Sequence, residues 1–164
     1  RTGLSVFEAR ILLDHHRTAF PDFWRWSDAA QDTAALTGYL TTVFGWRCAW
    51  GPDFNPRSAR NFPAQANGAE MLRLACIFAA EAGVRLLAPV HDALVFEYRI
   101  EHRETAVDMI RTAMAQASSI ILGGPELRVD VETYSYPERF RSEKGAAMWG
   151  KVCKILKEID ESNS

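Results

Sequence analysis

A histidine and an aspartate stand together at His91-Asp92, between two short apolar runs. The runs, residues 86–90 and 93–96, are separated by these two residues alone, which is the spacing of a β-hairpin with a polar tip. A carboxylate at such a tip is held rigidly, faces solvent and can bind a hard cation. Aspartate is also an ordinary turn residue. The dipeptide by itself therefore leaves both a metal site and a simple turn open.

The composition restricts the classes of protein that this chain can belong to. The 164 residues are 48% hydrophobic, enough for one sizeable core, and carry a formal net charge of -2. Without a basic excess, any contact with nucleic acid must be a local patch. Three cysteines without a CxxC pair indicate neither a disulfide framework nor a zinc site. We expect a soluble, cytoplasmic protein with no membrane span and no leader of its own, and the first residue, Arg1, indicates a start inside a longer polypeptide.

Three elements are predicted before residue 57. The capping box Ser5-x-x-Glu8 begins a helix that runs to about Ala19. Pro21 suits the first turn of a second helix, which Gly38 ends. Residues 39–50 are rich in β-branched and aromatic side chains and predict a short hairpin, followed by an exposed loop.

The elements after the loop predict an α+β fold, with a small antiparallel sheet packed against helices. A largely buried helix is expected over residues 64–82, with the 85–98 hairpin after it and Pro89 at an edge or a bulge. A helix over residues 101–117 and a strand over 127–134 follow, and we expect the strand to pair in the sheet. A last amphipathic helix spans about 145–159, and its apolar stripe is predicted to dock on the parent protein: Met148, Val152, Ile155 and Ile159.

A longer pattern surrounds the His91-Asp92 turn. Residues 57–70 read RSARNFPAQANGAE, a helix follows, and residues 86–97 read LLAPVHDALVFE. This order of Arg, three residues, Asn, x, Pro, x, Gln, helix and His-Asp turn resembles the palm of family A (polymerase I type) DNA polymerases, where the turn is motif C. The likeness extends upstream through Glu8-Ala9-Arg10, His16-Arg17, Phe20-Pro21 and the segments 38–40 and 42–45, and covers roughly the first 135 residues.

The resemblance implies template-directed nucleotidyl transfer by a DNA-directed DNA polymerase, with two Mg²⁺ ions and with DNA primer-template and dNTP as partners. It makes Asp92 the motif C metal ligand and a catalytic residue, and places His91, also catalytic, near the primer-terminal backbone. It assigns Arg57, Asn61 and Gln65 to DNA binding, with Gln65 at the minor-groove acceptors that every base pair presents. On residue type alone, Arg57 and Arg60 could instead lie on a solvated loop, and Asn61 and Gln65 could cap a helix.

The chain also departs from the family pattern. Ala93 replaces the glutamate that usually follows the motif C aspartate, and Trp46 stands where an arginine is expected. The other metal-binding aspartate (motif A) and the fingers precede the region represented here, so the remainder of the polymerase is expected in cis or in trans. One carboxylate cannot hold two divalent ions, and we expect the isolated chain to be inactive.

Alternatives to a catalytic fragment remain open. One is a non-catalytic nucleic-acid-binding or structural module derived from the palm. Another is an unrelated metal-dependent hydrolase, which would need Glu97 or Asp130 to converge on Asp92. A metal site at Asp14-His15-His16 is disfavoured, because adjacent residues of a helix point about 100° apart. Trp24 is expected in the core, whereas Trp46 and Trp50 could be core residues or stacking platforms.

The predicted organisation is a single domain over residues 1–164, the C-terminal palm portion of a bacterial or phage-like intracellular polymerase. Its expected parts are a helical hairpin and a β-hairpin over 1–50, a palm core over 57–135, and a C-terminal helix and tail over 136–164.

Overall fold

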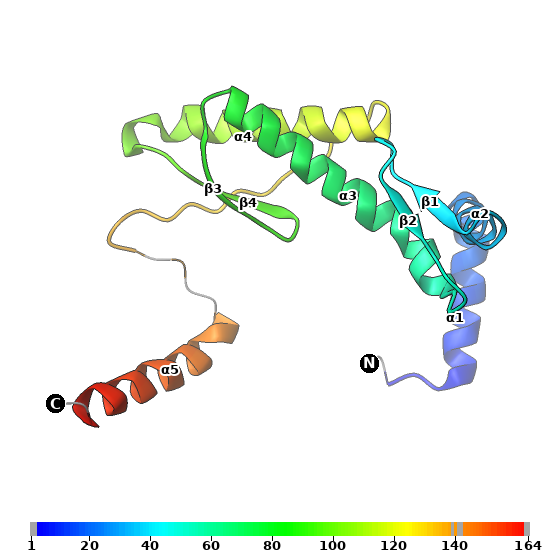
Figure 1. Ribbon diagram of the computed structural model, residues 1–164, viewed down its shortest axis with the longest axis horizontal. Helices are drawn as coiled ribbons and strands as arrows, with labels where there is room; N and C mark the ends of the chain where they lie inside the picture. The colour runs from blue at the N-terminus through cyan, green and yellow to red at the C-terminus, as the bar shows by residue number, and fades with distance from the viewer. Residues whose placement is uncertain (1–2, 139, 141–142, 163–164) are drawn as a thin grey trace. The chain divides into compact units, whose positions relative to one another are not determined.

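A computed structural model describes residues 3–138, 140 and 143–162 (Figure 1). Its residues form two compact units, which divide between Val129 and Asp130. The boundary falls inside the predicted palm core of residues 57–135. The predicted division of the chain into parts of a polymerase palm stays a prediction. The α+β fold is confirmed, because helices are combined with small antiparallel sheets.

Helices α1 (Val6–Ala19) and α2 (Pro21–Thr37) form the predicted helical hairpin. The capping box is confirmed: the Ser5 hydroxyl and backbone N–H both donate to the Glu8 carboxylate, and these bonds lower the pKa of that carboxyl. Gly38 ends α2 at a left-handed φ of 77°. Trp24 is half-buried, and its indole N–H donates to His16 Nδ1 over 3.0 Å. His16 therefore joins the two helices.

Strands β1 (Tyr39–Thr41) and β2 (Arg47–Ala49) form the first antiparallel pair, as expected. The turn between them is fastened to the following helix by a buried carboxylate. Glu70 is 3% exposed, accepts a 2.8 Å hydrogen bond from the Thr42 hydroxyl and pairs with Arg73. The Arg73 guanidinium lies 5.5 Å from the centre of the exposed Trp46 ring, within reach of a cation–π contact, so Trp46 lies outside the core. We call these four residues the Glu70 latch.

Helix α3 (Pro56–Glu81) begins eight residues before the predicted start at residue 64. The turn residues Gly51-Pro52-Asp53 and Asn55-Pro56 suggested an exposed loop before residue 64, but the Asn55 side chain accepts from the N–H groups of Arg57 and Ser58 and caps the helix there. Pro56 occupies the first turn, where its missing N–H costs nothing. Pro63 lies inside the helix, which continues through it. The loop interpretation of residues 57–63 was therefore wrong.

Strands β3 (Arg85–Val90) and β4 (Ala93–Glu97) form the predicted hairpin, with Pro89 opposite Leu94 and a register shift between Leu86 and Ala88. Pro89 thus lies in a two-stranded sheet, in which each strand is an edge. A short 3₁₀ turn, η1 (Ile100–His102), precedes helix α4 (Arg103–Leu122), which continues past the predicted end at residue 117 to the left-handed Gly123.

The core lies where α3, α4 and the β3–β4 hairpin meet (Figure 1). Small residues at the contact, Ala79 and Ala113, let the two helices approach closely beside the buried Ile110. Phe96 of β4 and Leu86 of β3 pack against this cluster from the sheet. The hairpin that carries His91 and Asp92 is therefore anchored at its base by the core.

The strand predicted over residues 127–134 is absent from this part of the chain, all of which the structure describes. The Leu127 N–H donates to the Ser118 hydroxyl of α4 instead of to a neighbouring strand, and this bond diverts the backbone from the sheet. In the second unit, helix α5 (Glu143–Ser162) includes the predicted 145–159 helix and is longer at both ends. Within the described residues, no helix is long and apolar enough to cross a membrane.

Candidate functional site

The tip of the β3–β4 hairpin exposes both side chains of the turn, His91 and Asp92. His91 has a φ of 54°, and it is the one non-glycine residue of the described chain with a positive φ. Such a left-handed conformation is uncommon for a residue with a Cβ, although histidine adopts it more often than most. A two-residue hairpin turn demands positive φ at its first position, so the short connection holds the tip in one conformation.

Asp92, His91 and Gln65 line one hollow of about 680 Å³, together with Arg128. Small and apolar residues of α3 and Met114 of α4 also line it. We call it the hairpin hollow. Gln65 comes from the middle of α3, the tip residues come from the sheet, and Arg128 follows α4. A cation, an amide, an imidazole and a carboxylate therefore meet at one concave surface, which suits a ligand with phosphate and hydrogen-bonding groups.

Arg57 and Asn61 lie on the same face of α3 as Gln65, because the three residues are spaced four apart. All three are exposed, but only Gln65 lines the hairpin hollow. Arg57 lies about 12 Å along the helix from Gln65, given a rise of about 1.5 Å per residue. The three side chains thus form a polar row that leads away from the hollow.

Arg60 does not belong to this row. Its guanidinium donates to Gln31 and Ser27 of α2 and pairs with Asp28. The side chain is only 24% exposed, so the solvated loop face considered for Arg60 was wrong. Arg60 instead fastens α2 to α3.

Among the described residues, Asp92 is the sole acidic one that lines the hairpin hollow. Ala93 adds no second carboxylate, and Glu97 pairs with Arg85 over 2.8 Å at the opposite end of the hairpin. Within the described part of the chain, no three His, Cys, Asp or Glu side chains gather as a metal site. Two Mg²⁺ ions need more oxygen ligands than one carboxylate offers. The residues present therefore suit one ligand of such a site and do not suit a complete site.

Arg128 was not predicted from the sequence as a site residue. Nothing in its neighbourhood resembles a motif, and the expected strand would have placed it in a sheet. Its position depends on Ser118, which is 2% exposed. The Ser118 hydroxyl donates to the Ala115 carbonyl over 2.8 Å and accepts from the Leu127 N–H over 2.9 Å. This pair of bonds holds the residue next to Arg128 against α4.

We expect the substitution Ser118→Ala to lower the free energy of unfolding by about 1–2 kcal/mol, because it leaves the Leu127 N–H without its acceptor. The free energy that protects the Leu127 amide from hydrogen exchange should fall by a similar amount, so this amide should exchange faster. Urea denaturation and amide exchange measure the two effects. Ser119→Ala is the matched control: its hydroxyl donates to the Gly124 carbonyl at the surface and should cost no more than about 0.5 kcal/mol. Equal losses in both variants would contradict the anchoring role.

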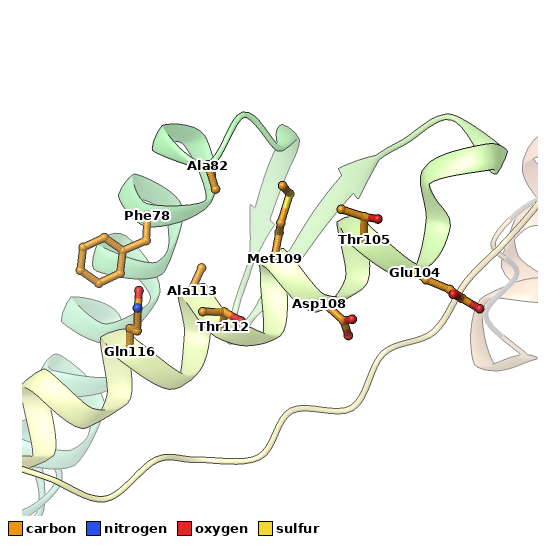
Figure 2. Close-up of a pocket in the computed structure, with 9 residues that line it drawn as sticks. All are labelled: Phe78, Ala82, Glu104, Thr105, Asp108, Met109, Thr112, Ala113 and Gln116. Carbon is orange, nitrogen blue, oxygen red and sulfur yellow. The ribbon is translucent and has the colours of Figure 1, made fainter.

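A second hollow, of about 470 Å³, lies between the C-terminal part of α3 and α4 (Figure 2). Phe78 comes from α3 and Ala82 directly follows it, whereas the two carboxylates of the hollow, Glu104 and Asp108, come from α4. Asp108 lies 3.9 Å from Arg111, one turn further along the same helix. None of the residues predicted for catalysis, metal binding or DNA binding lines this hollow. The candidate chemistry is therefore concentrated at the hairpin hollow.

Proteins of known name resemble this chain over most of its length. DNA polymerase I of Rhizobium leguminosarum is 32% identical over 139 residues, which cover 74% of this chain and 13% of that protein. DNA polymerase I of Aquifex aeolicus is 30% identical over 138 residues, which cover 79% of this chain and 23% of that protein. The chain thus spans less than a quarter of the length of these relatives.

Among solved structures, the POL domain of Pol1 from M. smegmatis, in complex with DNA primer-template and dNTP, is similar in fold. The TM-score is 0.61 at 27% sequence identity, over 70% of this chain and 23% of that one. The sequence pattern of DNA polymerase family A matches residues 1–135, which contain the hairpin hollow, the polar row on α3 and the Glu70 latch. This chain is therefore a member of DNA polymerase family A.

Proposed function

We propose that this chain is the C-terminal palm portion of a DNA-directed DNA polymerase and forms one side of its active site. The observation that carries the proposal is the meeting of Gln65, His91, Asp92 and Arg128 at the hairpin hollow of a family A chain. The reaction would be template-directed nucleotidyl transfer, in which the primer 3′ hydroxyl oxygen attacks the α-phosphorus of a dNTP and pyrophosphate leaves.

Each residue of the hollow has a role in this proposal. Asp92 supplies one carboxylate oxygen ligand for Mg²⁺, whose charge would neutralise phosphate oxygens during transfer. His91 donates to the backbone of the primer terminus. Gln65 donates its amide N–H to minor-groove acceptors, which lie at the same place in every correct base pair. Arg57 and Asn61 extend these contacts along the duplex, since they continue the polar row of α3 away from the hollow.

The remaining carboxylates and the nucleotide-binding fingers belong to the remainder of the polymerase, in cis or in trans. Helix α1 supports the need for such a partner, because it contains no buried residue. Four of its large apolar side chains are at least half exposed: Val6, Phe7, Leu12 and Leu13. Several exposed large apolar side chains on one helix are typical of a surface that another segment of the protein covers.

We expect the isolated chain of 164 residues to extend no primer in the presence of Mg²⁺ and dNTPs. One carboxylate neither neutralises nor coordinates two divalent ions, and Asp92 is the single acid of the hollow. A labelled primer-template and a gel assay test this expectation. The polymerase that contains this chain, assayed in parallel, is the positive control. Extension by the isolated chain would overturn the division of the active site between this chain and the rest.

The second candidate is a non-catalytic nucleic-acid-binding module derived from the palm. It is favoured by Ala93, because the hairpin then carries one carboxylate, Asp92, where the family pattern usually has an aspartate followed by a glutamate. The two candidates differ in their dependence on Asp92. A catalytic palm loses primer extension when this carboxylate is removed, whereas a binding module retains its DNA affinity and has no extension to lose.

A further inference from the structure

Helix α5 presents a continuous apolar face to solvent. Its six largest apolar side chains are between 36% and 66% exposed: Met148, Trp149, Val152, Ile155, Leu156 and Ile159. The family match ends at residue 135, so α5 is additional to the part of the chain that is shared with family A polymerases. An exposed apolar face of this size on one helix indicates an interaction surface.

The spacing of these residues indicates what the surface binds. Met148, Val152, Ile155 and Ile159 are separated by four, three and four residues, which is the alternation of d and a positions in a heptad repeat. Such a seam packs against another helix by knobs-into-holes contacts. The charges of α5 do not favour a polyanion as the occupant, because residues 143–162 contain four lysines and four acidic residues. Neither an anionic lipid surface nor nucleic acid is attracted by a helix with no net charge.

We propose that α5 pairs with α5 of a second copy of this chain, in antiparallel orientation. A two-fold axis near residues 153–154 places Met148 opposite Ile159 of the partner subunit and Val152 opposite Ile155 of the partner subunit. Each a position then faces a d position, which is the layering of an antiparallel coiled coil. The interface is isologous, so the same four residues of each protomer fill both halves of the seam.

The residues beside the seam complement each other in this register. Lys151 occupies a g position, and the antiparallel arrangement places it beside Glu158 of the partner subunit, so two symmetric ion pairs form on one flank. On the other flank, Trp149 meets Leu156 of the partner subunit, and both apolar side chains are covered. A parallel pair would place Lys151 beside Leu156 of the partner subunit, which buries an apolar group against a charge. The flanking residues therefore select the antiparallel orientation.

Sedimentation of the 164-residue chain over a range of concentrations tests the proposal. We expect a monomer–dimer equilibrium that Ile155→Asp weakens at least about 100-fold, because each dimer loses two buried isoleucines and gains two buried charges. Lys157→Asp is the matched control, since it introduces the same side chain on the opposite side of α5 and should leave the dimer unchanged. Circular dichroism of both variants checks that the helices are retained.

Charge reversal tests the register. Lys151→Glu and Glu158→Lys should each weaken the dimer by on the order of 10-fold, through two like-charge contacts per dimer. The double variant K151E/E158K should restore it, because each reversed charge again faces an opposite one. A chain that is monomeric at every concentration overturns the proposal. If the α5 amides of that monomer were protected from hydrogen exchange, α5 would dock on its own polymerase instead. The proposal is also overturned if Ile155→Asp leaves the dimer intact, or if the double variant K151E/E158K does not restore dimer formation.

Discussion

Asp92→Asn, introduced into the complete polymerase that we propose, should lower the rate of primer extension at least about 1,000-fold. The asparagine keeps the size of the side chain but removes the negative charge that binds a divalent cation. The charge stabilisation supplied by a bound metal ion is worth several kcal/mol, and each ~1.4 kcal/mol corresponds to a tenfold change in rate. Asp92 is exposed at a turn, so its replacement should leave the fold intact. Single-turnover extension assays measure the rate, and affinity for primer-template should change little.

Asp108→Asn is the matched control for this experiment. Asp108 is also an exposed carboxylate at the edge of a hollow, but that hollow contains none of the predicted site residues. Its replacement should leave extension within about twofold of the parent. If Asp92→Asn were as active as Asp108→Asn, the hairpin hollow would lose its catalytic role, and the non-catalytic binding module would become the better account of this chain.

Glu70→Ala should cause the largest loss of stability among the variants described here, about 3 kcal/mol. The carboxylate is buried, accepts from the Thr42 hydroxyl and pairs with Arg73. Removing one partner of a buried ion pair costs about 3–5 kcal/mol of stability. Arg73 is half-exposed and solvent screens its charge, so we expect the loss for Glu70→Ala to lie at the lower end of this range. Urea denaturation of the isolated chain measures the change. The loss should be accompanied by faster amide exchange in the β1–β2 hairpin.

Two further variants distinguish the loss of the Glu70 latch from the effect of removing any carboxylate from α3. Glu81→Ala removes an exposed carboxylate from the same helix and should change stability by no more than about 0.5 kcal/mol. Thr42→Val removes the donor at the other side of the hydrogen bond and should cost about 1–2 kcal/mol. A cost for Glu70→Ala no greater than that for Glu81→Ala would show that the carboxylate does not fasten the hairpin to α3.

Local sequence determined the elements whose signals lie within a few neighbouring residues. The Ser5–Glu8 capping box, Gly38 as a left-handed stop and the two-residue turn at His91-Asp92 all formed as predicted. Each depends on backbone groups that side chains close in sequence satisfy. The start of α3 was missed for a related reason: the local signal, Asn55 followed by Pro56, was read as a turn, although the same residues cap a helix when a helical segment follows.

Contacts between distant segments could not be predicted in this way, because hydrogen-bond partners in tertiary structure leave no periodic signal. The composition of residues 127–134 predicted a strand in the sheet. In the structure the Leu127 N–H donates to the Ser118 hydroxyl instead, and the next residue, Arg128, lines the hairpin hollow. Likewise Arg60 was assigned to solvent, but its partners on α2 are about thirty residues away.

The His91-Asp92 turn was therefore determined by the sequence itself, because residue type and spacing along one hairpin define it. Arg57, Asn61 and Gln65 were singled out by their resemblance to the family pattern, and only the structure places all three on one helix. The tertiary structure alone decided which of these side chains share a surface. Packing of α3, α4 and the β3–β4 hairpin around a small-residue core brings Gln65, His91, Asp92 and Arg128 to one hollow and leaves Arg57 and Asn61 outside its lining. The physical reason is that a local pattern fixes the direction of a side chain on its own element, whereas only packing fixes the distance between elements.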